Sequence, residues 1–165
     1  MDKLQKSVFE ALKLLIKNDI ELIKNKTREE CINHKLAQYL EHILLNEKIL
    51  TVHNVDIEYD KYKQGEKKSA DGRNIRPDII VHERKSGNRN NLIVIEAKKD
   101  YESEKDRGKI RNLVQNKETY SYSLGAAISY LPNKDYIKIK FLTPDNCWRF
   151  YWLYKKDFKI KETTR

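Results

Sequence analysis

A short apolar run that ends in charged residues restricts the fold of this chain more than any other feature. Leu92-Ile93-Val94-Ile95 would be apolar on both faces of an extended strand, and such strands usually lie in the middle of a sheet. The run continues into Glu96-Ala97-Lys98. Side chains two positions apart share one face of a strand, so Glu96 and Lys98 point the same way. The sequence therefore predicts a central strand that ends in two charged side chains, which is costly unless the charges are paired or bind a metal.

Helical periodicity appears both before and after this strand. Apolar residues recur at helical spacing from Asp2, the expected N-cap, to about Lys24. Thr27-Arg28-Glu29-Glu30 has the form of a capping box, so a second helix is expected to begin at Thr27 and to fade near Asn46. A third helix is predicted from Asp106 to Asn116.

The remaining apolar segments have the period of strands. A first strand is predicted over 49–52 and 55–59, and further strands over 77–82, 92–98, 124–131, 136–142 and 148–154. The tail after Phe158 is charged and is expected to fray. With 165 residues the chain has the length of one domain, comprising an N-terminal helix (2–24), a core (about 27–131) and C-terminal strands (136–156). The order of elements predicts an α/β fold with a central mixed sheet flanked by helices.

The charge balance restricts the partners. Thirty-four Lys and Arg against 25 Asp and Glu give a formal net charge of +9, which favours a polyanion such as nucleic acid. No apolar run approaches the roughly 18 residues of a membrane span, and the N-terminus lacks the pattern of a signal peptide. Two distant cysteines argue against a disulfide framework or a zinc site, and no nucleotide-binding glycine motif is present. We expect a soluble cytoplasmic protein that binds neither a membrane nor a small-molecule cofactor.

A second carboxylate is expected beside the central strand. Asp78 lies on the predicted strand 77–82, which a short turn joins to 92–98, so hairpin pairing can bring Asp78 next to Glu96. Two carboxylates that close repel each other, and a divalent cation resolves the repulsion. Oxygen ligands favour Mg²⁺ or Mn²⁺ over zinc. The alternative is a structural ion pair with Lys98, although buried ion pairs bring little net stability.

These residues match a known motif. Pro77-Asp78, followed on the next predicted strand by Glu96-Ala97-Lys98, resembles the signature of the PD-(D/E)XK nuclease superfamily. The predicted order of elements also resembles that family's αβββαβ restriction-endonuclease-like core, here with an extra N-terminal helix and extra C-terminal strands. The resemblance implies metal-dependent hydrolysis of phosphodiester bonds. It further implies that Asp78, Glu96 and the backbone carbonyl of Ala97 ligate the metal, while Lys98 positions the attacking water.

Members of the superfamily commonly add an acidic residue from the helix that precedes the sheet. Glu29 and Glu30 are both available. Glu30 already has a structural role at N3 of the expected capping box, whereas Glu29 continues the apolar stripe of Ile32 and Leu36 toward the core. We therefore expect Glu29 to be the additional catalytic residue and metal ligand, with Glu30 as the second choice.

Two residues near the end of the third predicted helix are weaker candidates. Gln115 resembles a glutamine that some members of the superfamily place on the helix after the lysine, followed by a tyrosine four residues on. Here the next tyrosine, Tyr120, is five residues on. Tyr120 could line the DNA groove, but an aromatic residue that leads into a strand is more typical of a core.

Basic residues flank the predicted centre on both sides along the sequence. The polar segment 60–74 is expected to be an exposed loop that leads into Pro77-Asp78. Phosphate contacts of this kind weaken steeply as the salt concentration rises. The residues expected to contact DNA are Lys61, Lys63, Lys67, Lys68, Arg73, Arg76 and Lys99.

The residues and the resemblance together predict a Mg²⁺- or Mn²⁺-dependent endodeoxyribonuclease. One such centre cuts one strand, so a double-strand break would need a homodimer or two encounters. The alternative is a non-catalytic module that keeps the nuclease-like fold, binds nucleic acid or a protein partner, and is indifferent to removal of divalent cations.

Overall fold

The structure is a computed structural model, and it describes residues 1–62, 65–68, 72, 74–84, 91–116 and 119–164. The helices are α1 (Lys3–Lys24), α2 (Glu29–Asn46) and α3 (Glu104–Gln115). The strands are β1 (Asn54–Ile57), β2 (Lys61–Tyr62), β3 (Gly65–Glu66), β4 (Ile79–His82), β5 (Ile93–Lys98), β6 (Leu124–Ser129), β7 (Tyr136–Leu142), β8 (Trp148–Tyr154) and β9 (Ile160–Thr163).

A seven-stranded sheet forms the centre of the molecule, in the order β1-β4-β5-β6-β7-β8-β9. The pair β5 and β6 is parallel and every other neighbouring pair is antiparallel, so the sheet is mixed. Strands β2 and β3 form a separate two-stranded sheet. The predicted α/β class is confirmed, and so is the interior position of β5.

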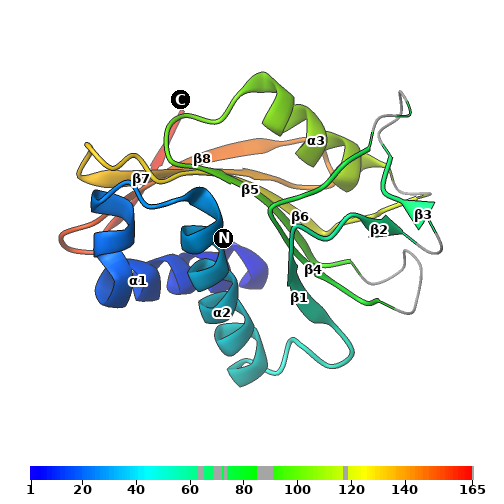
Figure 1. Cartoon of the computed structure of the whole chain (residues 1–165), viewed down its shortest axis with the longest axis horizontal. Helices are drawn as coiled ribbons and strands as arrows, with labels where there is room; N and C mark the ends of the chain where they lie inside the picture. Colours follow the sequence, from blue (N-terminus) through cyan, green and yellow to red (C-terminus); the bar gives the residue numbers. More distant parts are fainter. Residues whose placement is uncertain (63–64, 69–71, 73, 85–90, 117–118, 165) are drawn as a thin grey trace.

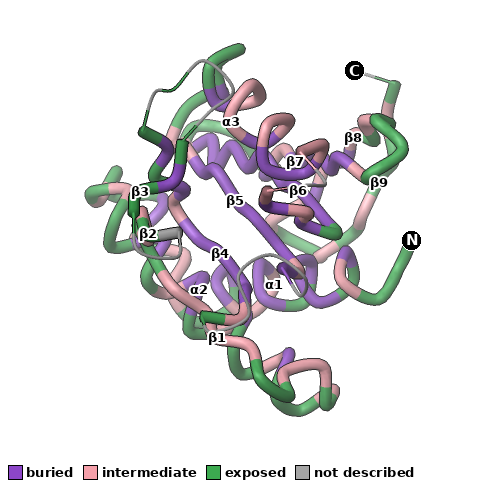
Figure 2. The backbone as a smooth tube through the Cα atoms, turned by 90° about the vertical axis from the view of Figure 1, so that its right-hand side faces the viewer, coloured by how far each residue is buried: buried purple, intermediate pink, exposed green. Residues whose placement is uncertain are grey.

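The two faces of the sheet are covered by different helices (Figure 1). On one face, α1 and α2 bury the odd-numbered residues of β5, such as Ile93 and Ile95. On the other face, α3 packs over Val94 through Ile110 and Leu113. Both faces of β5 are therefore buried, which is why its sequence is apolar throughout its first half (Figure 2). None of the helices in the described part of the chain has the length and apolar character needed to cross a bilayer.

The first helix begins as its sequence predicts. The side chain of Asp2 accepts a hydrogen bond from the backbone N–H of Gln5, and the side chain of Gln5 accepts one from the backbone of Asp2. This reciprocal arrangement satisfies two N–H groups that a helix start leaves without partners.

The predicted capping box at Thr27 is wrong. Lys26 has φ +52°, the N–H of Lys26 donates to Ile23, and the N–H of Thr27 donates to Leu22. These bonds form the Schellman motif that ends α1, so Thr27 belongs to the end of the first helix. The second helix consequently begins at Glu29, and its N-cap residue Arg28 makes no side-chain capping bond.

A similar turn overturns the first part, 49–52, of the first predicted strand. Lys48 has φ +55°, and the N–H groups of Lys48 and Ile49 bond back to Leu45 and Leu44 at the end of α2. These residues end a helix, and 49–53 connects α2 to β1 without forming a strand.

Two further expectations about loops are corrected. The described part of segment 60–74 contains β2, β3 and a bridge between Lys68 and Asn74, so it is not an irregular loop. The chain beyond Phe158 does not fray at once, because Phe158 adopts φ +58° in a tight turn and returns β9 along β8. Backbone pairing with β8 stabilises this charged segment, which has no apolar period of its own.

Two glycines provide a test of how α3 sits on the sheet. A Cβ added at Gly125 on β6 would overlap the Cγ2 of Ile110 and lie 2.9 Å from the Cγ2 of Val114. These branched side chains cannot move away easily, so Gly125→Ala is expected to lower the free energy of unfolding by about 1–3 kcal/mol. Urea denaturation measures the change.

The matched control is Gly108→Ala on α3, where an added Cβ meets nothing within 4 Å. Alanine in an open helix interior is more stable than glycine by about 1 kcal/mol, so this variant should be slightly stabilised. Equal effects of the two substitutions would contradict the close packing of α3 on β6.

Candidate functional site

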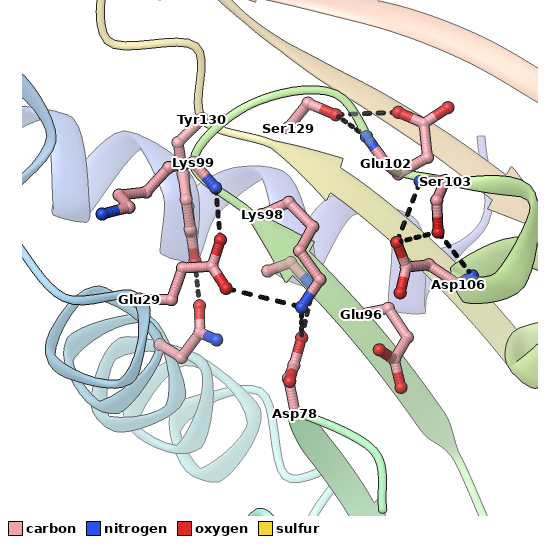
Figure 3. Close-up of polar contacts among 12 residues, drawn as sticks. Glu29, Asp78, Glu96, Lys98, Lys99, Glu102, Ser103, Asp106, Ser129 and Tyr130 are labelled. Carbon is pink, nitrogen blue, oxygen red and sulfur yellow. Dashed lines mark hydrogen bonds and ion pairs between the residues drawn. The ribbon is translucent and has the colours of Figure 1, made fainter. Parts of the chain in front are cut away.

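The predicted meeting of charged residues occurs where β4 begins and β5 ends. Strands β4 and β5 pair antiparallel, with Ile79 opposite Ile95, and Asp78 immediately precedes β4. The backbone N–H of Ala97 donates to Oδ2 of Asp78 at 2.7 Å, and Nζ of Lys98 lies 3.5 Å from the same oxygen. The charged ends of both strands therefore lie together on the α3 side of the sheet (Figure 3).

Glu96 is the most constrained member of this group. Its side chain is 0 % exposed, and its Oε2 accepts a hydrogen bond from Nζ of Lys109 on α3 at 2.9 Å. Its Oε1 is buried without a hydrogen-bond partner in the described part of the chain. Burial, and then repulsion by Asp78, raise the pKa of Glu96 to about 8. A buried carboxylate oxygen without a partner beside a second carboxylate is a position where a cation would be stabilised.

The pKa of Asp78 is subject to opposing effects, and burial is the largest of them. Burial raises the pKa of Asp78, and the hydrogen bond from Ala97 and the charge of Lys98 oppose that rise. The result is a carboxylate that is held in place by backbone and side-chain donors on one oxygen.

Lys98 remains a cation. Partial burial lowers the pKa of Lys98, but attraction by Asp78 and Glu29 outweighs this effect, so the pKa of Lys98 is raised overall. An ammonium group with a raised pKa holds its proton at neutral pH. It can therefore orient a water molecule or stabilise a phosphate oxygen, but it is not a general base.

The structure distinguishes Glu29 from Glu30. Glu29 is the first residue of α2, and its Oε2 accepts the backbone N–H of Lys99 at 2.8 Å, while its Oε1 lies 3.5 Å from Nζ of Lys98. Glu30 is exposed. Glu29 therefore points toward the end of β5, as predicted. The capping box in which Glu30 was expected to take part does not form.

The expectation that Glu29 joins Asp78 and Glu96 as a third carboxylate of a metal site is not met. Within the described residues, no three His, Cys, Asp or Glu side chains are grouped so that they could hold a metal ion. The reason is that Lys98 lies between Glu29 and Asp78 and pairs with both (Figure 3). Glu29 is thus a partner of the lysine.

The remaining donors still fit magnesium. Asp78 and Glu96 offer carboxylate oxygens, one of them buried and without a partner, and the carbonyl of Ala97 lies between Glu96 and Lys98 along β5. Mg²⁺ is commonly held by one or two carboxylates, with waters and substrate phosphates completing its shell. A third protein carboxylate is therefore not required for this ion.

Sequence reasoning missed the role of Lys109. It is the hydrogen-bond partner of Glu96, yet it lies thirteen positions away on a helix. A signal was present, because Asp106, Lys109, Ile110 and Leu113 share one face of α3 and Asp106, Ile110 and Leu113 are buried. Lys109 continues that inward face, so a charged partner for it could have been sought on the sheet.

A basic cavity opens beside this group. It has a volume of about 570 Å³ and lies between the segment Asn74-Ile75 and α3. Lys109 lines the cavity and also donates to Glu96, so this lysine separates the cavity from the buried carboxylate. Its other basic lining residues are Lys105 and Arg111.

The basic residues that were predicted to contact phosphates differ in how exposed they are. Lys61, Lys68 and Arg76 are exposed and Lys99 is half-buried, whereas Lys63 and Arg73 lie outside the described residues. Lys67 is only 2 % exposed, and its Nζ donates to the carbonyls of Tyr59 and Lys61. The expectation that Lys67 contacts DNA is corrected, because its ammonium group holds the loop together.

The two weaker candidates lie away from the carboxylates. Gln115 is at the end of α3 and lines a second cavity of about 430 Å³ with Arg111. Tyr120 is buried, and its hydroxyl accepts the N–H of Lys68 at 2.6 Å and donates to the carbonyl of Lys68 at 2.8 Å. Tyr120 therefore packs in the core and anchors the Lys67-Lys68 segment, and it does not line a groove.

Comparison with protein-family models, with curated proteins and with solved structures gave no match to this chain.

Proposed function

We propose that this protein is a Mg²⁺- or Mn²⁺-dependent endodeoxyribonuclease with a PD-(D/E)XK-like centre and a restriction-endonuclease-like arrangement of its sheet. One observation carries the proposal. Asp78 and Glu96 share one face of neighbouring strands, and the charge of Asp78 raises the pKa of Glu96. Glu96 has a buried oxygen without a partner in the described chain, and Nζ of Lys98 lies 3.5 Å from Asp78. An unsatisfied buried polar atom costs about 1–3 kcal/mol, so this oxygen favours a bound cation over a purely structural ion pair.

The metal would be held by Asp78, Glu96 and the carbonyl of Ala97. When bound, such an ion polarises the scissile phosphate and lowers the pKa of a coordinated water. The protein supplies the geometry. The N–H of Ala97 orients Asp78, and Lys109 orients Glu96.

Lys98 supplies the positive charge for the reaction. Its ammonium group donates to Asp78 and to Glu29 over 3.5 Å each. An ammonium group has three N–H donors, so one remains for a water or a phosphate oxygen. In this position Lys98 would orient the attacking water and stabilise the charge that develops on the phosphate. Glu29 acts through Lys98, which it keeps aimed at the centre.

Nucleic acid is the substrate class that fits the surroundings. The cavity beside Glu96 is lined by Lys105, Lys109 and Arg111, and the chain carries a net charge of +9. Phosphodiester backbones are bound by such surfaces through counterion release. Because one centre cuts one strand, nicking of one strand is the primary activity expected of a single chain, and a homodimer would be needed for a concerted double-strand break.

A second candidate is a non-catalytic module that binds nucleic acid or a protein partner with the same fold. It is favoured by one observation, that no three acidic, His or Cys side chains of the described residues form a metal-binding group. Such a module would bind its partner equally well with and without divalent cations.

The experiment that separates the two candidates is incubation of supercoiled plasmid with the protein in Mg²⁺ or in EDTA. The nuclease converts the plasmid to nicked circles in Mg²⁺ only, and Asp78→Asn, which keeps the shape of the side chain, abolishes nicking. Asp157→Asn, a change at an exposed turn, is the control that retains it. Plasmid that stays supercoiled with Mg²⁺ and with Mn²⁺ would contradict the proposal and favour the binding module.

A further inference from the structure

The α3 side of the sheet is only partly covered. Helix α3 packs on β5, β6 and β7, whereas β8 and β9 lie at the margin of the sheet farthest from β1 (Figure 2). On the opposite side, residues such as Ile139 and Tyr151 are buried under α1. The side chains that alternate with them emerge on the α3 side, where they are half-buried or exposed along β8 and β9.

These emerging side chains are aromatic and basic. We call them the aromatic–lysine surface, and its members are Tyr136, Lys138, Phe150, Trp152, Tyr154 and Lys161. Cross-strand pairing sets Lys138 opposite Trp152 and Tyr136 opposite Tyr154. Lys161 on β9 is opposite Trp152 from the other side. In the row of Lys138, Trp152 and Lys161, cationic and aromatic side chains therefore alternate across three neighbouring strands.

Two of the rings, those of Tyr136 and Trp152, stack on each other. Tyr136 and Trp152 have ring centroids 4.9 Å apart with an interplanar angle of 21°. Nζ of Lys161 lies 5.6 Å from the centroid of Trp152. Nζ of Lys140 lies 5.4 Å from that of Phe150, but Lys140 is buried and pairs with Glu102, so its charge is not offered to a ligand. Half-exposed rings with lysines at their faces form a surface that offers both flat apolar area and positive charge.

A cavity extends this surface toward α3. It has a volume of about 380 Å³ and lies between α3 and strands β7 and β8. Arg107 and Arg111 line it from the helix, and Trp148 and Phe150 line it from β8. Arg111 also lines the cavity beside Glu96, so one arginine borders both hollows.

A short loop connects the surface to the proposed cleavage centre. Tyr101 follows Lys98 by three residues, so their Cα atoms are at most about 11 Å apart. Tyr101 is 56 % exposed, and Nζ of Lys138 lies 5.6 Å from its ring centroid. The path from Lys98 over Tyr101 to Trp152 stays on the same side of the sheet as Asp78 and Glu96.

The combination of lysines and half-exposed aromatic rings indicates which class of ligand fits this surface. Lysines alone would suit any polyanion, but a row of half-exposed rings requires a partner with flat faces. In duplex DNA the faces of the bases are stacked on one another, whereas a single strand exposes them. Base–aromatic stacking together with a basic track along the backbone is the way in which proteins bind single strands without sequence preference.

We propose that the aromatic–lysine surface binds single-stranded DNA next to the cleavage centre, so that the nuclease acts on DNA with a single-stranded segment. Its place in the reaction rests on the proposed function, but the binding itself does not require cleavage. The bases stack on Tyr136 and Trp152, and the phosphates contact Lys138 and Lys161.

The binding is tested by fluorescence anisotropy in EDTA, with a labelled oligothymidine of about 15 nucleotides and with the same length of duplex. The wild-type protein should bind the single strand more tightly than the duplex. Trp152→Ala should weaken binding of the single strand about tenfold, and Trp152→Phe should retain most of it, because phenylalanine keeps an aromatic face. Lys13→Ala, which removes a half-buried cation from α1, should change the affinity little.

A spectroscopic measurement separates stacking from simple charge attraction. The chain has two tryptophans, so Trp148→Phe leaves Trp152 as the reporter. Stacking of thymine on Trp152 should quench its fluorescence on addition of the oligonucleotide. Unquenched fluorescence, or equal affinities of wild type and Trp152→Ala, would overturn the proposal. Self-association that Trp152→Ala abolishes, without binding of the oligonucleotide, would identify a second copy of the chain as the occupant and would also overturn it.

The failure of this inference can be told from the failure of the proposed function. Metal-dependent nicking of plasmid without binding of the single strand would contradict the proposed single-strand binding and support the proposed nuclease activity. Binding of the single strand that depends on Trp152, with plasmid that stays uncut in Mg²⁺ and in Mn²⁺, would support the proposed single-strand binding and contradict the proposed nuclease activity.

Discussion

Replacement of Lys98 by methionine is expected to reduce the rate of plasmid nicking in Mg²⁺ by about 100-fold or more. Methionine keeps much of the length of the side chain but removes the ammonium group that lies 3.5 Å from Asp78 and from Glu29. The charge that develops on the phosphate would then lack the stabilisation that this ammonium group supplies. The change is measured as the initial rate of conversion of supercoiled to nicked plasmid at saturating Mg²⁺.

The control for this variant is Lys13→Met, which removes one positive charge from an exposed pair on α1. Loss of one cation from α1, which covers the opposite side of the sheet from α3, should weaken DNA binding only slightly. Anisotropy with duplex DNA should show that Lys98→Met still binds, because the loss is in the reaction step. A Lys98→Met variant that cuts as fast as Lys13→Met would exclude the proposed role of Lys98.

The second large effect is a dependence of stability on pH that originates at Glu96. Its pKa is raised from 4.5 to about 8, chiefly by burial and then by Asp78. Between these two values the folded state keeps a proton that the unfolded state has lost, so the free energy of unfolding falls as pH rises through this window. The loss amounts to at most about 5 kcal/mol by pH 8. Urea denaturation in EDTA at pH 5 and at pH 8 measures it.

Mg²⁺ should reverse this loss. The ion binds the ionised carboxylates, so it stabilises the folded protein more at pH 8 than at pH 5. At a Mg²⁺ concentration about 100 times its dissociation constant, the gain is about 2.7 kcal/mol. Glu96→Gln should lose both the fall with pH and most of the gain from Mg²⁺.

Glu30→Gln is the matched control, because Glu30 is exposed and lies outside the carboxylate pair. It should keep the wild-type slope and the gain from Mg²⁺. A Glu96→Gln variant with the wild-type slope would place the titrating group elsewhere, and the absence of a Mg²⁺ effect in the wild type would remove the metal site.

Local patterns predicted most of the elements because their causes are local. The alternation along β7 and the apolar run of β5 reflect which face of each strand is buried, and this is visible in the order of residues. The start of α1 was predictable because Asp2 and Gln5 contact each other within one turn. The start of α2 was not, because Thr27 matched a capping sequence but already bonded to the preceding helix.

Some contacts of the candidate site were likewise predictable from the sequence, and others were not. Its residues Asp78, Glu96 and Lys98 were found from two strand ends that a single hairpin brings together. The contact of Lys109 with Glu96 and the contact of Glu29 with Lys98 required the packing of two helices against opposite sides of the sheet. The same packing placed a lysine between Glu29 and Asp78, where the sequence suggested a third metal ligand.

The sequence by itself determined the helices, the central strand and the pair of acids at its end, since each depends on neighbours a few residues away. Only the tertiary structure decided which partners those acids have and where the aromatic–lysine surface lies. That surface needs β9 to return along β8, and the pairing of β9 depends on backbone hydrogen bonds, which side-chain patterns do not encode. Contacts between distant segments arise from how buried faces are packed together, and a linear pattern does not specify that packing.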